Sequence, residues 1–176
     1  LRTLFPLSFD ERHRMNLVLD YRVGRNSNAP NILKNLGGNL QVSAVSGRPY
    51  TQTFLPTQFG GSGNESAFNA ARQPFNFTLN GQINKNFKIG QNASVNVYFR
   101  VSNILDRRNV LRVYSATGSA EDPGYLQSNF GRDEIEQISS GRRPLESFLA
   151  SYQWKVLNPN NFTLPRRMFL GAQFSL

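Results

Sequence analysis

Residues 93–103 read ASVNVYFRVSN, and apolar and polar side chains alternate along the whole segment. This period of two predicts a β-strand whose two faces meet different surroundings. The apolar residues of the segment are Ala93, Val95, Val97, Phe99 and Val101. The polar residues, on the opposite face, are Ser94, Asn96, Tyr98, Arg100 and Ser102. The segment therefore predicts a long strand with one apolar and one hydrated face.

Four more segments alternate in the same way, at residues 13–23, 36–46, 74–87 and 168–176. The polar face of 74–87 includes Asn76, Thr78, Asn80 and Gln82. The apolar face of 168–176 includes Leu170, Phe174 and Leu176. The polar faces hold mainly amides, hydroxyls and a few charges, which suits contact with water.

The length of these segments indicates the fold class. They have about 10 residues or more, which exceeds the ~5–6 of soluble sheets and is close to the ~9–11 of tilted membrane strands. No apolar run approaches the ~18–20 residues of a membrane-spanning helix, and the mean hydropathy is −0.45. We expect an all-β protein: a segment of an antiparallel transmembrane β-barrel. A soluble sandwich also alternates, with its polar face toward solvent, and stays open as an alternative.

The connections between the predicted strands differ in length. Residues 88–92 form a short turn, whereas residues 47–73 and 104–167 are long connections. Long outer loops and short periplasmic turns are typical of outer-membrane barrels. In the last connection, residues 132–140 and 144–156 carry apolar residues at helical spacing and predict two short helices.

The chain is basic, with 20 Lys and Arg against 11 Asp and Glu and a net charge of +9. A basic face can bind nucleic acid, but these residues are scattered and no motif of a nucleic-acid module occurs. We therefore expect no nucleic-acid partner. Arginines on loops can instead meet lipid phosphates or an anionic solute.

No catalytic constellation is visible in the sequence. Cysteine is absent, and the single histidine, His13, has only Asp10 and Glu11 as local acidic companions. That set is too small for a typical metal site. P-loop, Gly-x-Ser-x-Gly and His-Glu-x-x-His motifs do not occur. We expect no enzyme activity, no catalytic residue, no bound metal and no cofactor.

Four elements resemble the C-terminal barrel of TonB-dependent outer-membrane receptors of the carboxypeptidase-regulatory-like subgroup. Residues 9–16 (FDERHRMN) look like the family's Asp-x-Arg-His element at the top of a late strand. Residues 101–110 (VSNILDRRNV) are similar to the element that ends the penultimate strand. Residues 113–118 (VYSATG) look like the loop that follows, and residues 165–176 (PRRMFLGAQFSL) are similar to the closing strand. Leu176 departs from the terminal Phe that is usual there.

The resemblance implies that residues 1–176 are the C-terminal portion of such a barrel, about the last five of about 22 strands, without the plug. It implies a place in the bacterial outer membrane. It also implies TonB-coupled import of a scarce or bulky nutrient, such as a metal chelate, cobalamin, glycan or peptide. The implied partners are the rest of the barrel and its plug, the TonB complex through the missing N-terminal part, outer-membrane lipid and lipopolysaccharide. Glycan-importing relatives add a surface lipoprotein. The sequence does not name the solute.

In such a barrel the polar faces line the lumen and the apolar faces contact lipid. The lumen- or plug-facing candidates are Asn76, Thr78, Asn80, Gln82, Asn96, Tyr98 and Arg100. The lipid-facing candidates are Val95, Val97, Phe99, Val101, Leu170 and Phe174. Five strands cannot close a membrane barrel, since the smallest bacterial examples use about eight, so both edges must pair with further strands. A passive porin, a structural barrel in a larger complex and a soluble basic all-β binding module are the alternatives.

Overall fold

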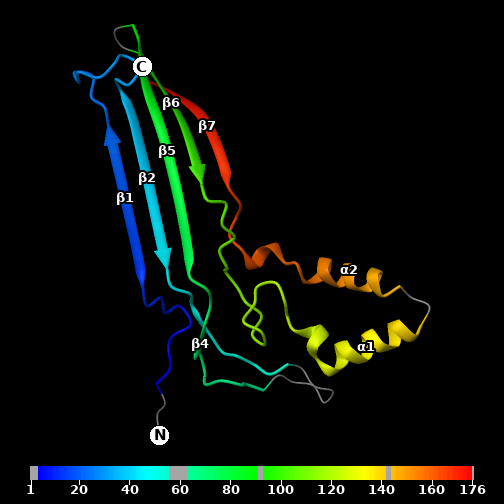
Figure 1. Ribbon diagram of the computed structural model, residues 1–176. Helices are drawn as coiled ribbons and strands as arrows, with labels where there is room; N and C mark the ends of the chain where they lie inside the picture. The colour runs from blue at the N-terminus through cyan, green and yellow to red at the C-terminus, as the bar shows by residue number, and fades with distance from the viewer. Residues whose placement is uncertain (1–3, 56–62, 91–92, 142–143, 176) are drawn as a thin grey trace. The chain divides into compact units, whose positions relative to one another are not determined.

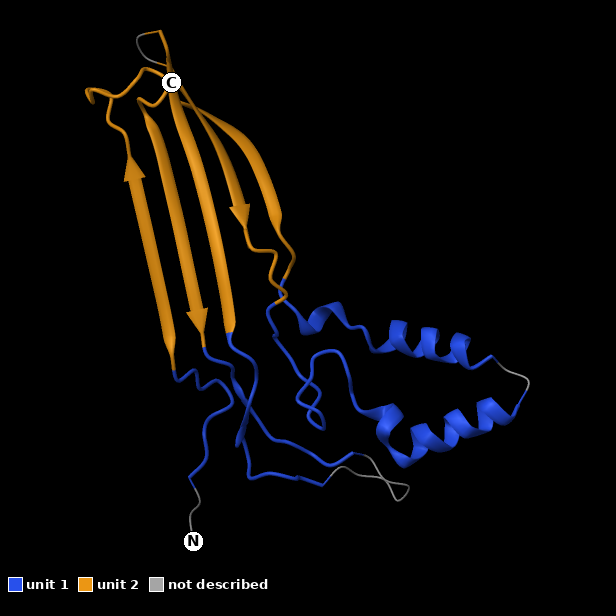
Figure 2. Ribbon diagram, viewed as in Figure 1, with its two compact units in different colours: residues 1–12, 46–75, 109–163 blue, residues 13–45, 76–108, 164–176 orange. Residues whose placement is uncertain are grey.

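The computed structural model describes residues 4–55, 63–90, 93–141 and 144–175, and the chain divides into two compact units (Figure 2). Residues 13–45, 76–108 and 164–176 form the first, called here the sheet unit. Residues 1–12, 46–75 and 109–163 form the second, called the loop unit. Each unit is assembled from separate segments, so the chain passes between them repeatedly.

Five long strands form the sheet unit: β1 (Arg14–Arg22), β2 (Leu36–Val45), β5 (Asn76–Ile89), β6 (Ala93–Ser102) and β7 (Arg167–Ser175). They lie in the order β1-β2-β5-β6-β7, and all neighbouring strands are antiparallel (Figure 1). These are the five segments in which apolar and polar residues alternate. The predicted antiparallel all-β class is therefore confirmed.

The strand boundaries differ by a few residues from those predicted. The third predicted strand, residues 74–87, begins at Asn76 and continues to Ile89. Phe75 therefore lies outside the strand, and 47% of it is exposed. Gly90, in the short predicted turn, has a φ of 70°, a conformation that glycine adopts without strain. The last two residues of that turn, at 91–92, and Leu176 lie outside the described residues.

The register gives the sheet two chemically distinct faces, because directly paired residues of antiparallel strands point the same way. One row across the sheet pairs Leu19, Leu40, Gly81, Val101 and Met168. The adjacent row pairs Asp20, Asn39, Gln82, Arg100 and Phe169. We call the side of the sheet that carries the first row the apolar face, and the side that carries the second row the polar face. The alternation within each strand is thus in phase across all five strands.

The two ends of the sheet differ in their connections. At one end β1 passes to β2 through residues 23–35, β5 passes to β6, and β7 finishes. We call this the turn end. At the opposite end β2 leaves toward residues 46–75, and β6 leaves toward residues 103–166. Short connections therefore cluster at one end of the sheet and long ones at the other.

The loop unit carries the remaining elements. A pair of two-residue strands, β3 (Pro49–Tyr50) and β4 (Ala71–Arg72), lies in the long connection 47–73, where no strand was predicted. The last connection holds η1 (Tyr125–Gln127), α1 (Asn129–Ser140), α2 (Leu145–Val156) and η2 (Pro159–Asn161). Both predicted helices exist.

Helix α1 begins three residues earlier than predicted because of its cap. The side chain of Ser128 accepts a hydrogen bond from the Gly131 amide at 3.2 Å, which satisfies one of the free amides of the first turn. Gly131 is buried, and a Cβ there would come within 2.1 Å of the Tyr125 carbonyl oxygen. A glycine is thus needed where α1 meets η1.

The described residues bury very little apolar surface. Apart from proline and glycine, Ala44 and Ala120 are the only apolar residues among them that are buried. On the sheet, Leu170 is 77% exposed and Phe174 is 76% exposed. The sheet unit is a single layer, so neither face is covered by a second sheet or a helix of that unit.

Among the described helices, none combines the length and apolar character needed to cross a bilayer.

Candidate functional site

All seven predicted lumen or plug candidates lie on the polar face, and three of them line one hollow. This hollow has a volume of about 360 Å³. Asn80, Gln82 and Arg100 line it, as predicted for a polar face. The Nε of Arg100 donates to Oε1 of Gln82 at 2.8 Å, across the β5–β6 pair. The hollow is therefore lined by side chains able to form several directed hydrogen bonds.

Sequence reasoning missed three residues of this hollow, Asn39, Gln41 and Ser102. Each lies at a polar position of an alternating strand, but it becomes a neighbour of Arg100 or Asn80 only through the strand register. Gln41 pairs with Asn80, and Asn39 pairs with Gln82. The alternation signalled their face, whereas their position beside Arg100 depends on which strands are neighbours.

A charged cluster continues the same face onto β1. Oδ1 of Asp20 accepts from Nε of Arg22 at 3.1 Å, and Oδ2 accepts from Nδ2 of Asn39 at 3.2 Å. Further along, the Ser43 hydroxyl donates to Asn16 at 2.8 Å. These exposed contacts orient the side chains but contribute little stability, since exposed ion pairs are worth about 0–1 kcal/mol.

Tyr98 and Arg100 form a second contact on the polar face. The guanidinium carbon of Arg100 lies 5.9 Å from the centre of the Tyr98 ring. Tyr98 lies over Gly171 of the paired strand, where a Cβ would come within 2.5 Å of the Tyr98 hydroxyl. The glycine leaves room for the ring to lie across β7, which fixes where the aromatic ring meets the arginine.

The remaining predicted polar residues lie elsewhere on this face. Thr78 is paired with Ser43 and Asn76 with Val45, toward the end of the sheet with long connections. Asn96 lies between Asn86 and Gln173 in the register, toward the turn end. Its Oδ1 atom is buried and accepts no hydrogen bond from the described residues. The seven candidates therefore share one face without forming one site.

Asn80 has a structural role that the sequence did not suggest. Its Oδ1 accepts a hydrogen bond from the Asn103 amide at 2.9 Å, directly after β6 ends. One oxygen of this predicted lumen residue is thus used to hold the turn that follows β6. A ligand at Asn80 would have to share that oxygen or use the amide nitrogen.

The six predicted lipid-facing residues lie together on the apolar face. Val95 pairs with Phe174, and Phe99 pairs with Leu170, which places the β6 and β7 members side by side. Beside them, a hollow of about 610 Å³ opens on this face. Its walls are mainly apolar and include Leu19, Leu40, Ile83, Phe99, Val101 and Ile104. Gly38 and Gly81 also line it, and a Cβ at Gly38 would meet no atom within 4 Å, so the glycine there leaves open space.

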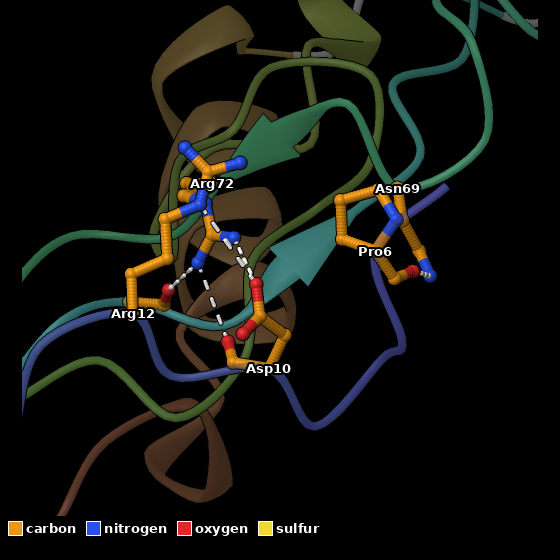
Figure 3. A network of polar contacts seen from close by, with 6 residues as sticks. Pro6, Asp10, Arg12, Asn69 and Arg72 are labelled. Atoms are coloured by element: carbon orange, nitrogen blue, oxygen red, sulfur yellow. Dashed lines mark hydrogen bonds and ion pairs between the residues drawn. The ribbon is translucent and has the colours of Figure 1, made fainter. Parts of the chain in front are cut away.

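In the loop unit, the predicted family element at residues 9–16 contributes to a polar network (Figure 3). The carboxylate of Asp10 forms an ion pair with Nη2 of Arg72, and Nε of Arg12 lies 3.9 Å from the same carboxylate. Nη1 of Arg72 donates to the backbone oxygens of Asp10 at 3.3 Å and Gly47 at 3.2 Å. Arg72 therefore fastens three backbone segments of this unit together.

The same network includes Asn69, whose Nδ2 donates to the Pro6 carbonyl at 2.7 Å (Figure 3). Glu11 accepts from Nε of Arg48 at 3.1 Å. Acidic residues near His13 thus have basic partners. No group of three or more His, Cys, Asp or Glu residues that could hold a metal ion occurs in the described ranges. We assign a structural role to this cluster.

An aromatic hollow of about 530 Å³ lies along α1 and α2. Tyr125 and Tyr152 stack with ring centres 6.0 Å apart, and Phe148 stacks on Tyr152 at 6.4 Å. The Tyr125 hydroxyl donates to Oε2 of Glu134 at 2.6 Å. That hydrogen bond raises the pKa of Tyr125, and burial raises the pKa of Tyr152. The rings stabilise the helical segment around η1.

No protein-family model, curated protein or solved structure matches this chain. The resemblance to TonB-dependent receptors therefore rests on the sequence elements at residues 9–16, 101–110, 113–118 and 165–176.

Proposed function

We propose that this chain forms part of the β-barrel of a TonB-dependent receptor in the bacterial outer membrane. The whole protein would import a scarce or bulky nutrient across that membrane with TonB-coupled energy. The five strands supply one section of the barrel wall. Their apolar face contacts lipid, and their polar face looks toward the lumen and its plug.

The observation that carries this proposal is the single-layered sheet with an exposed apolar face. A soluble domain rarely exposes an apolar patch of more than a few hundred Å², because water disfavours it. Here exposed apolar side chains continue across all five strands, from Leu19 on β1 to Leu170 on β7. Acyl chains are a surrounding in which such a face is stable.

The edges of the sheet support a larger closed structure. β1 and β7 are edge strands of nine residues each. In hydrocarbon, every unpaired backbone N–H or C=O group costs several kcal/mol, so open edges do not persist in a membrane. We therefore propose that further strands of the same barrel pair with β1 and β7.

The polar face supports a role in the lumen. Four amides, the Ser102 hydroxyl and Arg100 line its hollow, and these groups can bind a plug domain or a passing polar solute through directed hydrogen bonds. The internal bonds from Arg100 to Gln82 and from Asn103 to Asn80 hold this surface in place. We favour plug contact, since a preformed polar wall suits a permanent partner.

Neighbouring residues on β1 allow a direct test of membrane contact. Val18 and Leu19 are both apolar and exposed, at 57% and 52%, but Val18 lies on the polar face and Leu19 on the apolar face. In a membrane barrel, Leu19→Lys should destabilise the full-length protein by about 2–4 kcal/mol, the cost of a lysine facing lipid near the midplane. Val18→Lys should cost less than about 1 kcal/mol, because it faces water.

The measurement is denaturant unfolding of the full-length protein refolded into lipid vesicles, together with the amount of folded protein in the outer-membrane fraction. Equal effects of the two substitutions would contradict lipid contact. A protein that leaves cells in buffer without detergent would favour the soluble binding module instead.

Conductance separates a plugged transporter from a passive porin. The full-length protein is placed in a planar bilayer between KCl solutions, and steady current is recorded. A plugged barrel should conduct little, because the lumen is filled, whereas an open porin conducts continuously. A large, steady current would contradict the proposed active transport and would still be consistent with a membrane barrel.

A further inference from the structure

The turn end of the sheet is uniformly basic. Its segments, residues 22–36, 84–97 and 170–176, contain no aspartate or glutamate. The basic residues of these segments are Arg22, Arg25, Lys34, Lys85 and Lys88. The register brings the strand ends of these segments together at the turn end of the sheet. Arg22 forms an ion pair with Asp20, but the segments that hold the other four basic residues contain no acidic residue, so this end of the sheet carries a net positive charge that attracts anions.

Lys85 has an unusual position within this basic end. Among the described residues of the five strands, it is the only charged residue on the apolar face, paired with Leu36 on one side and Val97 on the other. Its ammonium donates to the Ile32 carbonyl and lies 5.4 Å from the centre of the Phe87 ring. An ammonium has three donors, so Lys85 can hold an anion in addition to the Ile32 contact.

The apolar hollow of about 610 Å³ lies on the same face of the sheet as Lys85, although Lys85 does not itself line it. Ile83 lines the hollow and precedes Lys85 by two residues on the same face of β5. Two residues along a strand span about 7 Å, so the backbone of Lys85 lies about that far from the backbone of Ile83 at the wall of the hollow. A cation beside an elongated apolar space matches an amphiphile with an anionic head and an acyl chain.

We infer that Lys85 and the hollow at Gly38 and Gly81 form a binding site for an anionic glycerophospholipid. The phosphate group contacts the Lys85 ammonium, and one acyl chain lies in the hollow. This inference rests on the proposed function: in outer-membrane barrels the short connections lie on the periplasmic side, so we place the turn end there. The lipid therefore comes from the inner leaflet, where glycerophospholipid and not lipopolysaccharide is the neighbour.

The charged part of the site is tested with a matched pair of substitutions on β5. Lys85→Gln and Lys88→Gln remove the same charge from the same strand, but Lys88 pairs with Ser94 on the polar face. Full-length protein in mild detergent is titrated with phosphatidylglycerol, and bound lipid is counted by native mass spectrometry. Lys85→Gln should weaken binding about five-fold, while Lys88→Gln and Lys85→Arg should stay near wild type.

The acyl part is tested at Gly38, where an added Cβ meets no atom within 4 Å. Gly38→Leu places a branched side chain in the hollow and should weaken binding of both phosphatidylglycerol and phosphatidylcholine with the same acyl chains. Gly38→Ala is the control, because a methyl group leaves most of the space open. Lys85→Gln, in contrast, should lower only phosphatidylglycerol binding.

Several outcomes would overturn this inference. Equal losses for Lys85→Gln and Lys88→Gln would show diffuse charge attraction without a site. Unchanged lipid binding by Gly38→Leu would show that the acyl chain does not lie in the hollow. Preferential binding of purified lipopolysaccharide would show that the ligand is not a glycerophospholipid. These results leave the proposed barrel intact. If the protein is extracted in buffer and binds no lipid, the proposed function fails as well.

Discussion

Asn103 shows how one residue can join the two ends of a long connection. It follows β6 with a φ of 55° and is only 6% exposed. Its Nδ2 donates to the carbonyl oxygens of Arg107 at 3.0 Å and Leu164 at 3.2 Å, and its Oδ1 accepts from the Arg107 amide. Asp106 adds a second link by accepting from the Arg166 amide at 2.7 Å. The family-like element at 101–110 thus has a structural explanation.

Replacing Asn103 should destabilise the full-length protein measurably. Asn103→Ala loses the three side-chain hydrogen bonds and places alanine in a left-handed conformation, so we expect a cost of about 2–4 kcal/mol. Asn103→Gly loses the same bonds but tolerates the backbone conformation, and should cost about 1 kcal/mol less. The measurement is the denaturant midpoint in lipid vesicles. A wild-type midpoint for Asn103→Ala would contradict the assigned role.

At the scale of elements, the contact between η1 and α1 depends on a protonated tyrosine. The Tyr125 hydroxyl donates to the Glu134 carboxylate, and this bond raises the pKa of Tyr125 above its ordinary value of 10.0. A raised pKa means that folding favours the protonated form. The stabilisation is therefore fully present below pH 10.0 and is lost as the pH rises through the higher folded-state value.

This contact should loosen only in alkaline solution. We expect tyrosinate absorbance of Tyr125 to appear at higher pH than in an unfolded control, accompanied by loss of helical circular dichroism. Glu134→Gln removes the carboxylate and should lower the titration midpoint toward the ordinary value. The difference between the spectra of the wild-type and Tyr125→Phe proteins gives the titration of Tyr125 alone. A midpoint that is unchanged in Glu134→Gln would show that the hydrogen bond is not the cause.

At the scale of the whole molecule, the exposed apolar face and the edges of β1 and β7 have a common consequence. Residues 1–176 expressed alone should aggregate in buffer, because exposed strand edges and apolar faces associate. Detergent should reduce this aggregation by covering the apolar face. Sedimentation with and without detergent measures the effect. A stable monomer in buffer would contradict both the membrane assignment and the need for further strands.

Much of the sheet was predictable from local pattern. Alternation located all five strands, and it assigned Val95, Val97, Phe99 and Val101 to one face and Asn96, Tyr98 and Arg100 to the other. Strand ends were less predictable: Phe75 continued the alternation but lies before β5. The short strands β3 and β4 were missed because a two-residue pair has no detectable period.

The alternating pattern was sufficient for strands and faces because side chains of an extended chain point alternately to opposite sides, whatever lies beside them. Which residues are neighbours across the sheet could be learned only from the folded chain. Gln41 meets Asn80 through the β2–β5 register, and Asp10 meets Arg72 across 62 positions of sequence. Such contacts join distant residues, and a single sequence carries no periodic signal for them. The lone charge of Lys85 on an apolar face likewise emerged only when the strands were set side by side.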